Sequence, residues 1–190
     1  MTLLLAGCAA TPSPPPQLYQ LRLAPPEPLA AATITPPATP AEAWQLILPV
    51  QVPEYLDRDA LLLPTGQAGL QPLGRHRWAE PLRDALPRLL RADLAAWRGA
   101  GSVWLAPLPP GLAITRELRV ELLAFEALPD RSGVHLRARW SLTAGGPAGA
   151  PAVHEEDLTA ASTGPEPDAL VAAHRLALWR LAQRIATPPR

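Results

Sequence analysis

The sequence predicts an α+β fold, in which a mainly antiparallel sheet carries two amphipathic helices packed on one face. Three observations support this. Segments with strand and helix patterns follow one another in the order strands, helix, strands, helix. Three segments alternate apolar and polar residues, and two others repeat apolar residues at helical spacing. The chain has 190 residues and is 48% hydrophobic, which is enough for one domain with a substantial core.

The first strands are predicted before residue 64. Residues 17–23 alternate apolar and polar side chains and predict a short strand, followed by an extended surface loop over residues 24–41. Residues 44–52 and 59–63 are two further apolar runs, which end at Pro53 and Pro64. These two runs are predicted to open the folded domain.

A helix is predicted next, because the apolar period changes to that of a helix. Pro81 suits the first turn, and Gly99 is a suitable stop. The apolar residues at helical spacing are Leu82, Leu86, Leu89, Leu90, Leu94 and Trp97.

The second half of the chain predicts a short strand, a hairpin, another strand and a closing helix. The short strand covers residues 102–106. Residues 117–124 and 134–142 alternate and flank a turn sequence at residues 129–133, which predicts the hairpin. Residues 153–162 are a further strand candidate. Asp168 is predicted to cap a helix whose apolar stripe is Val171, Leu178, Leu181 and Ile185.

Composition argues against several functions. Seventeen basic residues balance seventeen acidic ones, and a net charge of zero is not typical of a protein that binds nucleic acid. The chain has no lysine, which excludes a phosphate-binding loop of the Walker A type, and no serine lies in a Gly-x-Ser-x-Gly motif. We therefore predict no catalytic residues and no enzymatic activity.

The densest group of candidate metal ligands is His154-Glu155-Glu156-Asp157. On a strand, His154 and Glu156 share one face while Glu155 and Asp157 share the other, so only two ligands converge. A solvated acidic edge is the expected role, with no metal and no other cofactor. His135 is expected on the polar face of its strand, and His174 at a boundary of the core.

A short apolar run at the N-terminus ends in Leu5-Ala6-Gly7-Cys8. This sequence resembles the lipobox of bacterial lipoproteins. This predicts that residues 1–7 are a signal-peptide remnant and that Cys8 is the lipid attachment site. No Arg or Lys precedes Cys8, so we expect that the natural start lies upstream or that the chain was trimmed. Ala9, rather than Asp, follows the cysteine, and by resemblance to the sorting of enteric lipoproteins this implies the outer rather than the inner membrane. The alternative is a free, buried cysteine.

Residues 8–43 are predicted to be a lipidated, proline-rich tether with one short strand, and residues 44–190 a single α+β domain. Ten of the thirty residues from 11 to 40 are proline, which keeps the chain extended. At about 3.1 Å per residue, the segment between Cys8 and Gln17 would span roughly 28 Å.

Two motifs resemble the PqiC/YmbA family of ABC-type transport auxiliary lipoproteins. The first is a Pro-x-Tyr-Leu-x-Arg turn after a strand, and the second is a Trp-Ala-x-Pro-Leu segment that opens the first helix. Here they comprise Tyr55, Leu56, Asp57 and Arg58, and then Trp78, Pro81 and Leu82, which are the candidate partner-binding residues.

The resemblance implies a lipoprotein anchored on the periplasmic face of the outer membrane. It would be a non-enzymatic accessory subunit of an MCE-type system that moves phospholipid between membranes. Its expected partners are a PqiB-like MCE-domain protein, the inner-membrane transporter of that protein, and further copies of itself in a homo-oligomer. Alternatives are a lipoprotein that binds lipid itself and a cell-envelope hydrolase.

Three of the motif residues also have a structural alternative. Tyr55 can pack on the sheet, Arg58 can pair with Asp57 or with backbone carbonyls, and Trp78 can pack beneath a neighbouring loop.

Overall fold

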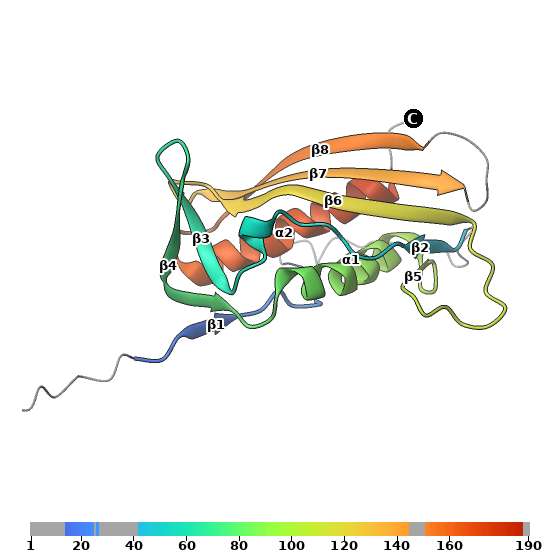
Figure 1. The fold of residues 1–190 in the computed structure, drawn as a ribbon, viewed down its shortest axis with the longest axis horizontal. Helices are drawn as coiled ribbons and strands as arrows, with labels where there is room; N and C mark the ends of the chain where they lie inside the picture. Colours follow the sequence, from blue (N-terminus) through green and yellow to red (C-terminus); the bar gives the residue numbers. More distant parts are fainter. Residues whose placement is uncertain (1–13, 25, 27–41, 145–150, 188–190) are drawn as a thin grey trace, which may run out of the picture.

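The computed structural model describes residues 14–24, 26, 42–144 and 151–187, and its main element is a five-stranded sheet with strand order β5-β2-β6-β7-β8 (Figure 1). Three long strands, β6 (Arg116–Ala127), β7 (Gly133–Ala144) and β8 (Ala152–Ala161), pair antiparallel. The short strand β2 (Trp44–Leu46) pairs parallel with both β5 (Val103–Trp104) and β6. The sheet is mostly antiparallel, as predicted.

The predicted hairpin turn joins β6 to β7. The Leu128 amide donates to the Gly133 carbonyl at 2.8 Å, and an Asp130 carboxylate oxygen accepts from the Ser132 amide at 3.0 Å. Arg131 adopts a positive φ of 60° between them. An aspartate that closes a turn onto the backbone two residues on is what the sequence pattern indicated.

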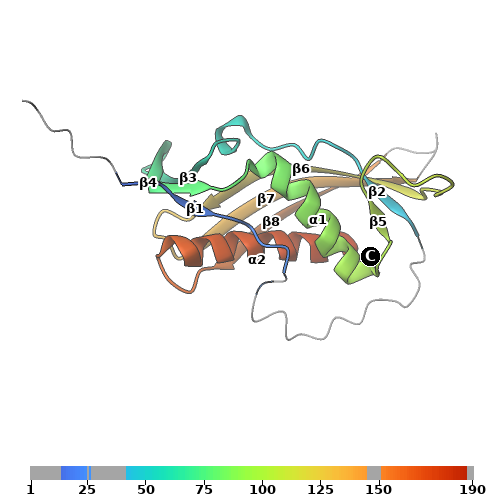
Figure 2. The ribbon, with the colours of Figure 1, turned by 90° about the horizontal axis from the view of Figure 1, so that it is seen from below.

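Both helices lie on one face of this sheet, as Figure 2 shows. Helix α1 (Leu82–Arg98) is followed by Gly99, as predicted. Helix α2 (Pro167–Ala186) begins one residue earlier than Asp168. The predicted Asp168 cap is wrong, because Pro167 occupies the first helical position with its fixed φ and Asp168 lies within the first turn.

A second sheet, of strand order β1-β4-β3, was not predicted. Strand β1 (Gln17–Tyr19) pairs parallel with β4 (Gly69–Trp78), and β3 (Ala60–Thr65) pairs antiparallel with β4. Strand β4 contains Pro72 and Gly74, which disfavour strands, and Gly74 has a φ of +53°. The segment forms a strand because it pairs with β1 and β3, although its residue composition disfavours one.

Strand β2 covers only the first part of the strand predicted over residues 44–52. Pro49 interrupts it, because proline has no N–H to donate to the neighbouring strand. Gln51 then rejoins β6 through an isolated bridge to Glu121. A 3-10 turn, η2 (Glu54–Leu56), leads from there into β3.

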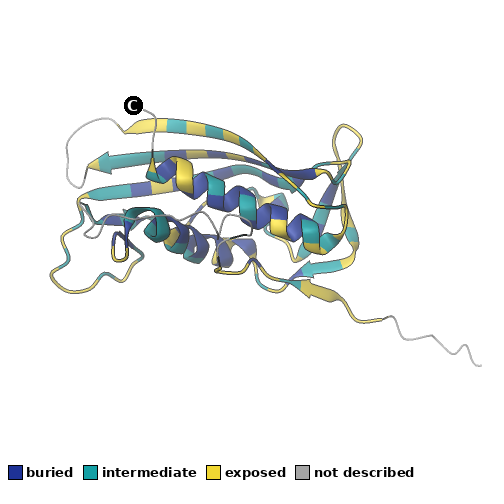
Figure 3. Cartoon of the chain, turned by 180° about the vertical axis from the view of Figure 1, so that it is seen from behind, coloured by how far each residue is buried: buried dark blue, intermediate teal, exposed yellow. Residues whose placement is uncertain are grey.

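The core lies between the five-stranded sheet and the helices. Figure 3 shows buried residues on the helix faces that meet the sheet. The largest fully buried side chains include Trp140, Trp179 and Phe125. In the described part of the chain, no helix is long and apolar enough to cross a bilayer.

Candidate functional site

The two motifs meet at the end of the molecule where β1, β3 and β4 lie, but most of their side chains have structural roles. Leu56, Trp78 and Leu82 are core residues. Pro81 is the N-cap of α1. Trp78 ends β4 instead of opening the helix, and its amide donates to the Asp59 carbonyl at 2.6 Å.

Trp78 packs edge-on against His174, with ring centroids 5.4 Å apart, and Phe125 does so from another side at 4.9 Å. The prediction that His174 lies at a boundary is wrong, because it is only 5% exposed. Its Nδ1–H donates to the Leu170 carbonyl at 2.8 Å. Burial lowers the pKa of His174 to about 4, so the ring is neutral and belongs to the apolar core.

Asp57 does not pair with its neighbour Arg58. One Asp57 carboxylate oxygen accepts from an Arg83 Nη at 2.6 Å, which ties the turn to the first turn of α1. Arg58 is exposed. The structural alternative in which Arg58 pairs with Asp57 is therefore not observed, because helix α1 brings Arg83 to the carboxylate.

Tyr55 and Arg58 are the motif residues that border an open groove of about 550 Å³. Burial, and then the nearby Glu126 carboxylate on β6, raise the pKa of Tyr55, so its hydroxyl stays protonated. The groove is lined by Tyr55, Arg58, Asp59, Ala60, Leu62, Leu70, Pro72 and Arg77. An amphipathic tyrosine and an arginine beside an apolar floor suit contact with another macromolecule.

A buried ion pair joins the two helices beneath β1, and no part of it was predicted. The guanidinium of Arg175 on α2 donates to both carboxylate oxygens of Asp93 on α1, at 2.5 and 2.7 Å. It also donates from Nε to the Arg22 carbonyl at 2.6 Å and from Nη2 to the Leu23 carbonyl at 3.3 Å. We call Asp93, Arg175 and these two carbonyls the anchor junction.

The anchor junction fixes the part of the predicted tether that follows its short strand, residues 19–23. The Leu21 side chain between β1 and the junction is 2% exposed. The Ala79 amide donates to the Tyr19 carbonyl at 2.7 Å, and the Tyr19 hydroxyl lies 3.1 Å from Nδ1 of His76. Residues 19–23 are thus held by hydrogen bonds and burial.

One signal in the sequence could have revealed the anchor junction. Asp93 is spaced at four and three residues from Leu89 and Leu90, and Arg175 at four and three residues from Val171 and Leu178, so each charge falls on an apolar stripe. Opposite charges on the buried faces of two helices indicate a buried pair, because an isolated buried charge is costly.

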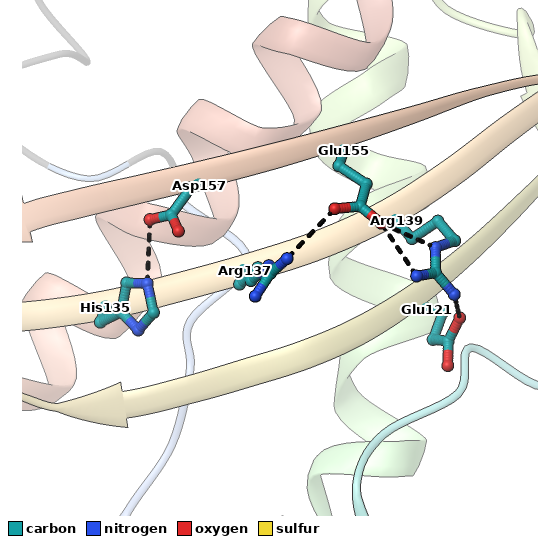
Figure 4. Close-up of polar contacts among 6 residues, drawn as sticks. All are labelled: Glu121, His135, Arg137, Arg139, Glu155 and Asp157. Atoms are coloured by element: carbon teal, nitrogen blue, oxygen red, sulfur yellow. Dashed lines mark hydrogen bonds and ion pairs between the residues drawn. The ribbon is translucent and has the colours of Figure 1, made fainter.

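The outward face of the five-stranded sheet carries a series of charged pairs, which we call the outer ladder (Figure 4). Arg139 contacts Glu155 at 2.8 Å and Glu121 at 3.5 Å, and Arg137 contacts Glu155 at 3.2 Å. His135 lies 2.9 Å from Asp157. Glu155 and Asp157, two of the three acidic side chains of β8, are thus paired across to β7.

The predicted alternation of the acidic segment is confirmed by the strand register, in which His154 lies opposite Trp140 and Glu156 opposite Ala138. The His154 ring stacks on the buried Trp140 at 4.1 Å. Across residues 14–24, 26, 42–144 and 151–187, no group of three His, Cys, Asp or Glu side chains could hold a metal ion. The predicted lipid site, Cys8, lies outside the described residues.

Comparison with known proteins gives one family and two similar folds. A family model described as "ABC-type transport auxiliary lipoprotein component" matches residues 19–186. A crystal structure of an uncharacterized protein is 20% identical, with a TM-score of 0.69, and the match covers 91% of this chain and 97% of that one. Protein XCC0632 from Xanthomonas campestris, of family DUF330, is 17% identical, with a TM-score of 0.64 and coverage of 90% and 92%. No curated protein matches the chain.

Proposed function

The chain belongs to the family of ABC-type transport auxiliary lipoprotein components, and from this premise we propose that it docks an MCE-domain protein at the outer membrane. Acylated Cys8 would hold the chain on the periplasmic face, and the folded domain would contact the partner without catalysing a reaction. The inner-membrane transporter of the MCE protein would complete the system, with phospholipid as its cargo.

The observation that carries this proposal is the position of Tyr55 and Arg58. These are the two motif side chains that border a groove, and that groove lies on the small sheet that includes β1, the short strand within the predicted tether. A partner bound there would be held close to the anchored end of the chain. Tyr and Arg are enriched among residues that contribute most to binding at protein interfaces.

The anchor junction supports a mechanical role. Four hydrogen bonds from Arg175 fix Asp93 and the backbone of residues 22 and 23. A load applied between an acylated Cys8 and the domain would pass through this fixed segment. A docking protein needs such a joint, because a loosely attached tether would not hold a partner at a defined distance from the bilayer.

The size of the narrow cavity beneath the motifs favours docking over lipid carriage. Its walls include Leu56, Trp78, Phe125 and His174, and its volume is about 20 Å³. This is about the space that one water molecule requires. An acyl chain would need the core to open.

The proposal is tested by recovering the chain and its partners from detergent-solubilised envelope. We expect Cys8→Ala to move the protein to the soluble periplasmic fraction while it still recovers the MCE-domain protein. We expect Tyr55→Ala/Arg58→Ala to leave the chain on the membrane but to reduce partner recovery by about tenfold or more, as for residues central to an interface.

Arg91→Ala, which changes an exposed arginine on α1, is the matched control and should recover the partner normally. If the Tyr55→Ala/Arg58→Ala variant recovers the partner as well as the wild type does, the groove is not part of the interface. If the wild-type chain recovers no MCE-domain protein at all, the docking proposal itself is wrong.

A further inference from the structure

The small sheet β1-β4-β3 has two apolar faces, although only one of them is buried. Its inner face includes Leu61 and Leu63, which are 3% and 5% exposed. Its outer face is defined by register, since residues paired directly across strands project to the same side. Leu18, Arg77 and Ala60 form one row, Leu62 and Pro72 the next, and Pro64 and Leu70 the last.

This outer face exposes large apolar side chains. Leu18 is 64% exposed and Leu70 is 42% exposed, and Pro72 is also exposed. Scattered exposed leucines are common on proteins, but here they share one face with further apolar residues. A hairpin with apolar side chains on both faces requires a second apolar medium or partner on its outer side.

The charges beside this face suit the headgroup region of a bilayer. Arg58 and Arg77 flank the groove, and Asp59 lies 3.7 Å from Arg77, which leaves one excess positive charge among the three. Arginine and tyrosine place polar ends among headgroups while their apolar parts stay in contact with lipid. Tyr55 borders the same face.

The short stretch of chain between Cys8 and Leu18 indicates that this apolar medium is the bilayer. Leu18 is ten residues after Cys8, so an extended chain separates them by at most about 33–36 Å. If Cys8 is acylated, as the proposed function requires, the bilayer lies within that distance of the exposed leucines. A tethered surface meets the membrane at high effective concentration, so even a weak contact is populated.

We propose that the outer face of β1-β4-β3 rests on the bilayer that holds the lipid anchor, with Leu18 and Leu70 inserted at the headgroup boundary. The lipid anchor and this face then form two attachments instead of one, which fixes the orientation of the domain. Tyr55 and Arg58 line the same groove as Leu70, so a partner that docks there would contact the membrane surface as well as the domain.

The test uses the full acylated chain in vesicles of phosphatidylethanolamine and phosphatidylglycerol. Acylation consumes the thiol of Cys8, the one cysteine of the chain, so a Leu70→Cys variant carries a single free thiol for an environment-sensitive fluorophore. We expect lipids with brominated acyl chains to quench the probe severalfold more strongly at position 70 than at position 48, since apolar interface residues lie about 5–10 Å deep.

The control, Leu48→Cys, also replaces an exposed leucine, at 46% exposure, but on the segment beside β6. Equal quenching at positions 48 and 70 would overturn the proposal. Vesicle flotation of the same samples reports the lipid anchor separately: a chain that does not float has no acylated Cys8, and the proposed function fails there.

A second variant separates a bilayer from a protein as the occupant of this face. We expect Leu18→Glu, in the Leu70→Cys background, to reduce quenching at position 70 while recovery of the MCE-domain protein is unchanged. Loss of partner recovery without any change in quenching would assign the face to the protein partner and overturn the proposal. A thermal melt that matches that of the wild type shows that the exposed substitution leaves the fold intact.

Discussion

The anchor junction and the outer ladder use the same chemistry in opposite environments. In the junction, the Arg175 and Asp93 side chains are 5% and 1% exposed. In the ladder, Arg139 and Glu155 are 46% and 44% exposed. Both are arginine–carboxylate pairs with close contacts, and both join different elements of the fold. Their difference is the amount of water that each charge retains.

This difference sets what each pair can do. In the junction, Arg175 is committed to a carboxylate and two backbone carbonyls, so removal of the guanidinium leaves several buried polar groups without a partner. In the ladder, water replaces any contact that is lost, and an exposed pair contributes little. The junction therefore fixes residues 19–23 to the folded domain, while the ladder keeps the outward surface of β6, β7 and β8 hydrated.

The largest effect is expected for Arg175→Met. The Asp93 carboxylate would stay buried without its cation, and loss of one partner from a buried ion pair costs about 3–5 kcal/mol. The Arg22 and Leu23 carbonyls would lose their donor as well. Urea denaturation measures the free energy of unfolding, and limited proteolysis before residue 24 reports release of the anchored segment.

The matched control is the double variant Asp93→Leu/Arg175→Met, which leaves no buried charge. It should recover part of the lost stability, since an apolar pair of similar volume can replace a buried ion pair. It should not restore protection of residues 19–23, because those carbonyls still lack a donor. If the single and double variants unfold at the same urea concentration, burial of an unpaired charge is not the cause.

Local patterns made the main fold predictable from the sequence. The two helices, the β6–β7 hairpin and its turn follow from period and turn chemistry, which act between residues close in the chain. Pro81 and Gly99 bracket α1 as predicted. Such features need no knowledge of tertiary contacts.

The small sheet and the anchor junction depend on contacts between distant residues, so local patterns do not reveal them. Strand β4 contains Pro72 and Gly74 and becomes a strand through pairing with β1 and β3. Arg175 meets Arg22 across more than 150 positions. For the candidate site, the motifs named seven residues, but only the fold separates half-buried Tyr55 and exposed Arg58 from the buried members.

The second-largest effect, after that of Arg175→Met, is expected in the dependence of stability on pH. Burial raises the pKa of Asp93 to about 6, and the hydrogen bonds and charge of Arg175 oppose this shift. Between about pH 4 and 6, Asp93 is ionised in the unfolded chain but still protonated in the native state. The native state therefore binds more protons, and this residue makes the free energy of unfolding fall as the pH rises. His174 has the opposite sign: its pKa is lowered to about 4, so the unfolded chain keeps a proton that the native state lacks, and stability rises through about pH 6.5.

The contributions of Asp93 and His174 to the free energy of unfolding therefore oppose each other between pH 4 and 6. His174→Gln should remove the rising contribution, on the order of 3 kcal/mol, and leave a protein whose stability falls over this range. Asp93→Asn should give the opposite slope. Arg91→Ala, which changes an exposed arginine on α1, is the control and should keep the wild-type profile. A changed slope in that control instead would place the pH dependence at the surface.

The smallest effect is expected in the outer ladder. Arg139→Ala removes the contacts to Glu155 and Glu121, but Arg137 still donates to Glu155, and all of these side chains remain in water. The urea midpoint should match that of the wild type within error. A double-mutant cycle of Arg139→Ala with Glu155→Ala should give a coupling near zero, which falls further in high salt as the charges are screened. A loss comparable to that of Arg175→Met would contradict the comparison, because burial would then not be what separates the two ion-pair systems.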